Sequence, residues 1–156
     1  MILTKACDFN IHEPTILDEC SVIEMQKEFF NTNCKFNGTS NLDLFNNYID
    51  WLANTINQGY FYNFCGISGK KFTYLVTINN HLIGMFELII YINSQNQQSA
   101  HIVECIRPSC RRLGYSKPLI KKAIFECLSF GIRNTNITFE RNNKASNASM
   151  TKALDF

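Results

Sequence analysis

One short stretch of the chain places a cluster of positive charge and a glycine immediately before a periodic apolar run. It reads Cys105-Ile-Arg-Pro-Ser-Cys-Arg-Arg-Leu-Gly-Tyr-Ser-Lys117. The first amides of a helix lack intrahelical partners and carry the positive end of the helix dipole, so they attract phosphate groups. Arg111, Arg112 and Lys117 add positive charge beside those amides, and Gly114 allows the backbone to turn close to a ligand. The stretch therefore predicts a binding site for a small anion.

Such an anion site requires a strand before it and a helix after it. The apolar pattern predicts a strand over residues 101–107 and a helix over residues 117–131, with Gly131 as its C-terminal cap. A further short strand is predicted over residues 136–140. Strand, helix and strand make a parallel βαβ unit, in which ligands bind at the carboxyl ends of the strands. The basic turn lies at that end.

The rest of the chain predicts the elements that must surround this unit. We expect helices over residues 18–30, 42–57 and 146–154, and an antiparallel hairpin over residues 72–78 and 82–92. The 42–57 helix should bury one stripe, made by Leu42, Phe45, Ile49, Leu52 and Ile56. Aromatic residues over 59–69 predict a loop that either covers a hydrophobic face or borders a binding cleft. Since no linker-like segment interrupts the sequence, we expect a single domain over residues 1–156.

The length and net charge of the chain limit the classes of protein to which it can belong. The chain has 156 residues and a formal net charge of +2, which argues against a general nucleic-acid binder. Six Arg or Lys residues and no acid lie between Arg107 and Lys122, so the positive charge is local and suits a small polyanion. No segment has the length of a membrane span or the layout of a signal peptide, and a cytoplasmic protein without membrane association is expected.

The seven cysteines are odd in number and form no Cys-x-x-Cys pair, which favours reduced structural thiols. The histidines show no ligand spacing beside them, so no metal site is expected. Cys110 is the candidate for an exposed, reactive thiol because it lies in the basic turn.

The spacing Arg111-x-x-Gly114-x-Ser116 resembles the Arg/Gln-x-x-Gly-x-Gly/Ala turn of the GNAT superfamily of acyl-CoA-dependent N-acyltransferases. The likeness covers roughly residues 22–154, as several weak motifs in the order found in a bacterial subgroup. These motifs are His101-Ile-Val-Glu-Cys-Ile106-Arg107-Pro108-Ser109, Met25-Gln-Lys-Glu28-Phe29, Gly38-Thr-Ser40, Tyr48-Ile-Asp-Trp51-Leu52 and Asn143-Lys-Ala145-Ser146. The resemblance implies an α+β fold: a mixed, mostly antiparallel sheet with a central splayed parallel βαβ unit and flanking helices.

The resemblance also implies acetyl-CoA as the co-substrate. Its pantetheine arm would pair with the backbone of Cys105 and Ile106, where the strand splays from its neighbour. Asn143 matches a family asparagine that contacts the cofactor, and it could equally cap the following helix. The pyrophosphate would lie against the backbone amides of the turn, contributed by Arg111, Arg112, Leu113, Gly114, Tyr115, Ser116 and Lys117.

The implied reaction is acetyl transfer to a primary amine, on a small molecule or a peptide, by direct attack in a ternary complex. The amine must lose a proton during this attack. Glu104 and Glu140 are the candidate proton acceptors by position, although each could be an ordinary surface acid, and His101 is a weaker candidate.

Departures from the family pattern keep open an alternative, a non-catalytic acyl-CoA-binding or interaction protein. Met150 stands where many of these enzymes have a tyrosine that protonates the leaving thiolate. Ile89 and Ile90 replace a polar pair of the subgroup, and the sequence ends at Phe156, before the two C-terminal strands of the family sheet. In that case the 136–140 strand would expose an edge through which two copies could pair as a homodimer.

Overall fold

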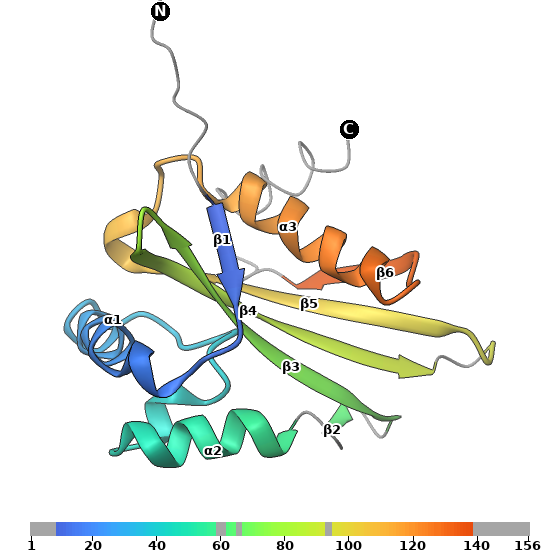
Figure 1. Ribbon diagram of the computed structural model, residues 1–156, viewed down its shortest axis with the longest axis horizontal. Helices are drawn as coiled ribbons and strands as arrows, with labels where there is room; N and C mark the ends of the chain where they lie inside the picture. The colour runs from blue at the N-terminus through green and yellow to red at the C-terminus, as the bar shows by residue number, and fades with distance from the viewer. Residues whose placement is uncertain (1–8, 59–61, 65–66, 93–94, 139–156) are drawn as a thin grey trace, which may run out of the picture.

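The computed structural model describes residues 9–58, 62–64, 67–92 and 95–138, which form a six-stranded sheet with flanking helices (Figure 1). The elements come in the order β1 (Phe9–His12), α1 (Glu19–Asn31), α2 (Tyr48–Gln58), β2 (Tyr62–Phe64), β3 (Ile67–Ile78), β4 (His81–Ile92), β5 (Gln98–Ile106), α3 (Ser116–Ser129) and β6 (Asn134–Thr138). The sheet order is β1-β3-β4-β5-β6, with β2 beside β3. Every pair is antiparallel except β5 and β6, which are parallel. The mixed, mostly antiparallel sheet confirms the predicted fold class.

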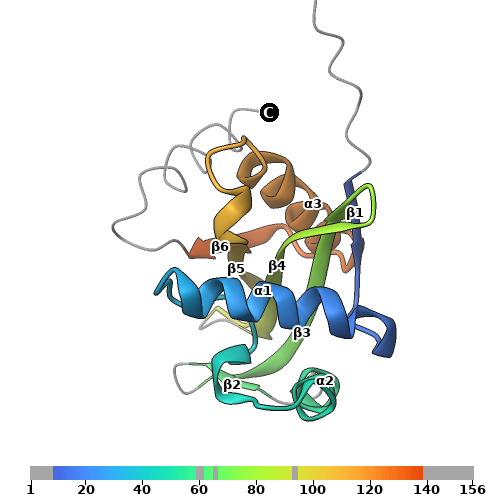
Figure 2. The same ribbon diagram turned by 90° about the vertical axis from the view of Figure 1, so that its left-hand side faces the viewer.

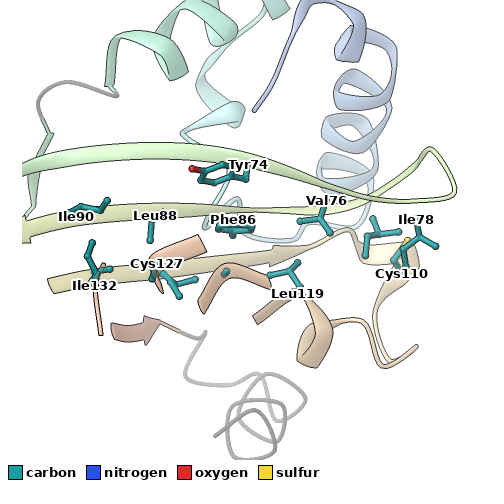
Figure 3. Close-up of a cluster of buried hydrophobic side chains, with 14 residues drawn as sticks. Tyr74, Val76, Ile78, Phe86, Leu88, Ile90, Cys110, Leu119, Cys127 and Ile132 are labelled. Atoms are coloured by element: carbon teal, nitrogen blue, oxygen red, sulfur yellow. The ribbon is translucent and has the colours of Figure 1, made fainter. Parts of the chain in front are cut away.

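The helices cover both faces of the sheet, with α3 on one face and α1 and α2 on the other (Figure 2). The core under α3 includes Tyr74, Val76, Phe86, Leu88, Ile102, Leu119 and Cys127 (Figure 3). The core under α1 and α2 includes Val22, Met25, Phe29, Trp51, Leu75, Met85 and Cys105. Successive strand residues point to opposite faces, so over residues 72–76, 85–90 and 100–105 even positions face α3 and odd positions face α1 and α2. None of the described helices is long and apolar enough to span a membrane.

The hairpin and the βαβ unit form as predicted, with shifted ends. β3 and β4 are joined by Asn79 and Asn80, whose φ angles of 49° and 64° are those of a tight type I′ turn. β5 and β6 run parallel from the pair Ser99–Asn134 to the pair Val103–Thr138, with α3 as the crossover. The predicted 136–140 strand thus begins two residues earlier, at Asn134. The predicted helix over 146–154 lies outside the described residues.

Two predictions for the first half of the chain are wrong. The helix expected over residues 42–57 begins only at Tyr48, because Leu42–Leu44 form a 3₁₀ turn and Phe45 after it is extended, a conformation that interrupts a helix. Its buried face therefore carries Tyr48 and Trp51, while Ile49 and Ile56 are 47% and 60% exposed. The loop expected over residues 59–69 contains β2 and the start of β3.

Candidate functional site

The candidate site lies at the carboxyl end of β5, where the chain leaves the sheet. The Arg107 N–H donates to the Ile83 carbonyl at 2.8 Å. In an antiparallel pair, hydrogen-bonded and non-hydrogen-bonded residues alternate along each strand. Cys105 is therefore a hydrogen-bonded position, and its backbone N–H and C=O point toward Met85, its partner on β4.

By the same alternation, Glu104 and Ile106 direct their backbone groups away from β4, toward the β6 side of the sheet. The described pairing of β5 with β6 reaches only Val103. The Ile106 carbonyl accepts a hydrogen bond from Arg111 Nε at 3.1 Å. An extended ligand laid along this edge would meet the backbone of Glu104 and Ile106 as an added strand would.

Between β5 and α3 the chain makes a short basic turn. Arg112 and Gly114 have left-handed backbones, with φ angles of 61° and 83°. A Cβ added at Gly114 would meet no atom of the described chain within 4 Å, so the space in front of this residue is open. Tyr115 occupies the N-cap of α3 and contributes no side-chain capping bond. The first amides of α3 thus keep the anion-attracting property of a helix start that its N-cap side chain leaves uncovered.

A largely buried ion pair between Arg107 and Glu28 connects this turn to α1. Arg107 Nε donates to one carboxylate oxygen of Glu28 at 2.6 Å, and the Ser109 N–H donates to the other. Burial raises the pKa of Glu28, but the hydrogen bonds from Arg107 and Ser109 outweigh it, and the net pKa lies below the ordinary value of 4.5. Through Glu28, α1 fixes the position of the basic turn.

The three cationic side chains of the predicted anion site do not lie together. Arg111 folds back toward α1, where its guanidinium lies 3.5 Å from Cys34 Sγ and 5.8 Å from the centre of the Phe29 ring. Arg112 is exposed, and Lys117 is half-buried in the first turn of α3. The structure therefore leaves Arg112 and Lys117 as the charges that flank the helix start.

Glu104 and Ser116, both predicted site residues, contact each other. The Ser116 hydroxyl lies 2.9 and 2.8 Å from the two carboxylate oxygens of Glu104 and donates to them. The side chain of Glu104 thus lies beside the first residue of α3, on the α3 side of the sheet. A carboxylate in this place opposes the binding of an anion at the helix start, because like charges repel.

The remaining predicted residues lie either in the turn or outside the described residues. Leu113 and Tyr115 lie in the turn, exposed and half-buried respectively, and Glu140, Asn143 and Met150 lie outside the described residues. The prediction of an exposed Cys110 is wrong: this side chain is 6% exposed. The 3₁₀ turn at Pro108–Cys110 carries it into the core under α3.

Sequence reasoning missed a polar cluster on the opposite face of the sheet, which we call the β3–β4 polar cluster and define as Ser40, Lys71, Thr73 and Glu87. Lys71 and Glu87 form an ion pair at 3.3 Å, although they are only 3% and 8% exposed. The Ser40 N–H donates to Glu87, and the Ser40 and Thr73 hydroxyls share a hydrogen bond. The available signal was Glu87 itself, since a glutamate in a central apolar strand must find a partner.

Comparison with known proteins gives this geometry a family context. The sequence model of the acetyltransferase (GNAT) family matches residues 39–156. No curated protein sequence matches the chain significantly.

Solved structures share the fold at low sequence identity. A transcriptional regulator from Bacillus halodurans is 14% identical with a TM-score of 0.62, over 95% of this chain and 92% of that one. Glucosamine-6-phosphate N-acetyltransferase from Arabidopsis thaliana is 12% identical with a TM-score of 0.59, over 93% and 89%. The Microcin C7 self immunity acetyltransferase MccE, solved with acetyl-CoA and AMP, is 16% identical with a TM-score of 0.65, over 93% and 77%. With the family model matching most of its length, the chain belongs to the GNAT family of acetyltransferases.

Proposed function

We propose that the protein transfers an acetyl group from acetyl-CoA to a primary amine, which attacks the thioester directly in a ternary complex. Family membership supports acyl transfer, and the MccE structure with acetyl-CoA supports this donor. The observation that carries the proposal is a continuous path along the chain, from the outward backbone of Glu104 and Ile106 to the open turn at Gly114 and the start of α3. A ligand with an extended arm and a diphosphate at one end fits this path.

In this proposal each part of the path binds a different part of acetyl-CoA. The backbone of Ile106 and its neighbours Cys105 and Glu104 would hold the pantetheine arm, with Ile106 and Glu104 contributing the groups that point away from β4. A carbonyl oxygen has two lone pairs, so the Ile106 carbonyl can accept from a pantetheine amide as well as from Arg111. The amides of residues 111–117 would hold the pyrophosphate, with Arg112 and Lys117 supplying charge.

The chemistry requires little beyond positioning and charge stabilisation. Holding the amine and the thioester together removes most of the entropic barrier to attack. A backbone N–H directed at the thioester oxygen would stabilise the negative charge that develops there, and our candidate is the Glu104 N–H, since it points away from β4. Glu104 and Glu140 remain the proton acceptors that the sequence proposes. For the acceptor we favour the amine of a small molecule over a peptide, since a structural neighbour acts on glucosamine-6-phosphate.

A charge reversal in the turn tests the binding half of the proposal. Acetyl-CoA is titrated calorimetrically into the wild type and into Arg112→Glu, with Lys122→Glu as control, because Lys122 is also exposed but lies farther along α3. We expect Arg112→Glu to bind at least about tenfold more weakly, since it turns an attraction for phosphate into a repulsion. Equal affinity of Arg112→Glu and the wild type would remove the pyrophosphate from this turn.

The position of Glu104 supports one alternative, a protein that binds an acyl-CoA without transferring its acyl group. The Glu104 carboxylate accepts from Ser116 beside the helix start, so it lies at the proposed diphosphate site and is poorly placed to take the proton of an amine at the thioester. Release of free thiol from acetyl-CoA, measured with a panel of primary amines, separates the two functions. Binding without thiol release across the panel would favour the alternative.

A further inference from the structure

The Arg111 side chain lies apart from the other cations of the basic turn. Its Nε donates to the Ile106 carbonyl at 3.1 Å, and its Nη1 lies 3.5 Å from Cys34 Sγ. The guanidinium carbon lies over the Phe29 ring, 5.8 Å from the ring centre. These contacts hold a half-buried positive charge between the end of β5 and the C-terminal end of α1.

The residues that contact the Arg111 guanidinium are themselves fixed in place. Phe29 is fully buried in the core under α1 and α2. The Cys34 N–H donates to the Phe29 carbonyl at 3.1 Å, and the Cys34 sulfur accepts from the Thr32 hydroxyl at 3.2 Å. The planar guanidinium is attracted to the aromatic face and can donate to a carbonyl at the same time. The end of α1 therefore offers Arg111 a preformed position that requires no ligand.

This position and the start of α3 belong to opposite faces of the sheet, which α1 and α3 cover (Figure 2). Phe29 lies in the core under α1 and α2, whereas Ser116, the first residue of α3, contacts Glu104 on the α3 side. To reach a diphosphate at the start of α3, the Arg111 guanidinium would have to leave all of its contacts. One of these is a hydrogen bond from a charged donor, which is stronger than a bond between neutral groups. The geometry therefore favours a structural contact with α1 over a contact with phosphate.

The bond from Arg111 to Ile106 acts on the path proposed for the pantetheine arm. Ile106 is the last residue of β5, and its backbone groups point away from β4. Among the described residues, β6 pairs with β5 only as far as Val103, so the Arg111 Nε–H takes the place of a partner strand and orients the Ile106 carbonyl. A carbonyl oxygen accepts two hydrogen bonds, so it can receive an amide of the arm at the same time.

We propose that Arg111 is a positioning residue for the pantetheine arm, which it serves by fixing the Ile106 carbonyl, and that it does not bind the diphosphate. This proposal rests on the proposed function. It gives the two adjacent arginines different roles: Arg112 supplies charge to the diphosphate, and Arg111 orients the acceptor of the arm. Because the contacts of Arg111 exist before the ligand binds, the arm meets a preformed hydrogen-bond acceptor, and less ordering is needed on binding.

Two ligands separate these roles. Acetyl-CoA carries both the arm and the diphosphate, whereas 3′-phospho-ADP carries the diphosphate without the arm. Both are titrated calorimetrically into the wild type, Arg111→Lys, Arg112→Gln and the control Arg133→Lys, an exposed arginine beyond α3. Lysine keeps the positive charge but lacks the planar fork that donates to Ile106 while lying on an aromatic ring.

We expect Arg111→Lys to bind acetyl-CoA about tenfold more weakly than the wild type and to bind 3′-phospho-ADP within about twofold of it. Arg112→Gln should weaken both ligands by a similar factor, because both contain the diphosphate. Arg133→Lys should bind both ligands as the wild type does. The expected result is therefore a loss that depends on the arm in Arg111→Lys and a loss that does not in Arg112→Gln.

NMR of the wild type follows the contact itself and does not depend on whether a variant folds. An Arg Nε–H that donates to a carbonyl is protected from exchange with water, and we expect this resonance for Arg111 both in the free protein and with 3′-phospho-ADP bound. Cys34→Ala removes the sulfur contact without changing the turn. It should weaken acetyl-CoA by about threefold and leave 3′-phospho-ADP unchanged.

Three results would overturn the proposal and leave acetyl-CoA as the ligand. The first is equal affinity of Arg111→Lys and the wild type for acetyl-CoA. The second is an equal loss of affinity for both ligands in Arg111→Lys, and the third is a change in the Arg111 Nε–H resonance to an unprotected state when 3′-phospho-ADP binds. Either of the last two would place Arg111 on the diphosphate. Failure of the wild type to bind acetyl-CoA would instead refute the proposed function itself.

Discussion

The two ends of α3 share a left-handed glycine and differ in what surrounds it. At the C-terminal end, Gly131 (φ 77°) donates to the Leu128 carbonyl at 2.9 Å, and Ile132 donates to the Cys127 carbonyl at 3.0 Å. These are the two bonds of a Schellman motif, and Ile132 is buried behind them. At the N-terminal end, Gly114 has nearly the same φ of 83°, and a Cβ at either glycine would meet no described atom within 4 Å, but the residues that precede Gly114 are basic.

We propose that this difference separates a structural glycine, Gly131, from a binding glycine, Gly114. The C-terminal end of α3 satisfies its exposed carbonyls with its own chain, so no ligand is needed there. At the N-terminal end the Tyr115 side chain makes no capping bond, and Glu28 holds the preceding turn through the Ser109 N–H. A helix start without a side-chain cap is the arrangement expected where a ligand binds the first amides.

We expect the largest loss of stability from a substitution at the C-terminal end of α3. Ile132→Ala removes a fully buried side chain behind the Schellman motif, and we expect it to lower the free energy of unfolding by about 3 kcal/mol. Chemical denaturation measures this loss, with Leu128→Ala as the control, since Leu128 is 48% exposed in the same turn. Acetyl-CoA affinity should not change, and a tenfold loss of affinity would contradict the division between the two ends.

The second largest loss of stability should come from removing Glu28, which holds the turn before the N-terminal end of α3. Glu28→Ala leaves the largely buried Arg107 without its partner, and we expect a loss of about 2 kcal/mol, reduced from a fully buried pair because Glu28 retains some contact with water. Glu24→Ala, an exposed acid on the same helix, is the control. Since the pKa of Glu28 is lowered in the folded state, its contribution is complete above the ordinary value of 4.5 and is lost as pH falls below it. A stability difference that persists unchanged at low pH would show that the charge of Glu28 is not involved.

The two glycines allow the most direct comparison. Gly114→Ala and Gly131→Ala each force a side chain into a left-handed backbone, and we expect each to cost about 1 kcal/mol of stability. Only Gly114→Ala should also weaken acetyl-CoA binding, by about tenfold, because its Cβ would stand where the phosphates approach the backbone. Calorimetric titration of both variants checks this, and equal affinities would mean that both glycines are structural.

The smallest effect concerns the carboxylate of Glu104, which lies beside the N-terminal end of α3. Glu104→Gln removes a negative charge next to the proposed diphosphate while keeping an oxygen that accepts from Ser116. We expect acetyl-CoA to bind about threefold more tightly in a calorimetric titration, as a partly solvated repulsion of less than about 1 kcal/mol is relieved. Ser116→Ala keeps the charge and should not tighten binding.

The sequence predicted the structure best where an element depends on consecutive residues. The strand, the basic turn and the helix around Gly114 could be predicted because their signals lie within consecutive residues and each depends on a short-range rule. The start of α2 was missed because it depends on the extended backbone of Phe45, and every residue type can adopt that conformation, so the sequence carries no signal for it.

Contacts between distant segments could not be predicted from the sequence. The Arg111 side chain turns to Cys34, 77 positions earlier, and Ser40 donates to Glu87, 47 positions later. Neither pairing has a sequence pattern, because both depend on how the helices pack on the sheet. The predicted charge cluster was therefore only partly reproduced, and the β3–β4 polar cluster was unforeseen.

The long hairpin has a consequence for the order in which the chain folds. β3 and β4, with twelve residues each, are joined by only two residues, so a long pairing forms at a low loop-closure cost, whereas β2, also two residues from β3, pairs over only three residues. β1 must close a loop of more than fifty residues to reach β3, and β6 can pair with β5 only after α3 has crossed over. We expect β3 and β4 to form the folding nucleus, with the two ends of the sheet joining later. Substitutions in the hairpin should slow folding, whereas those in β1 and β6 should mainly speed unfolding.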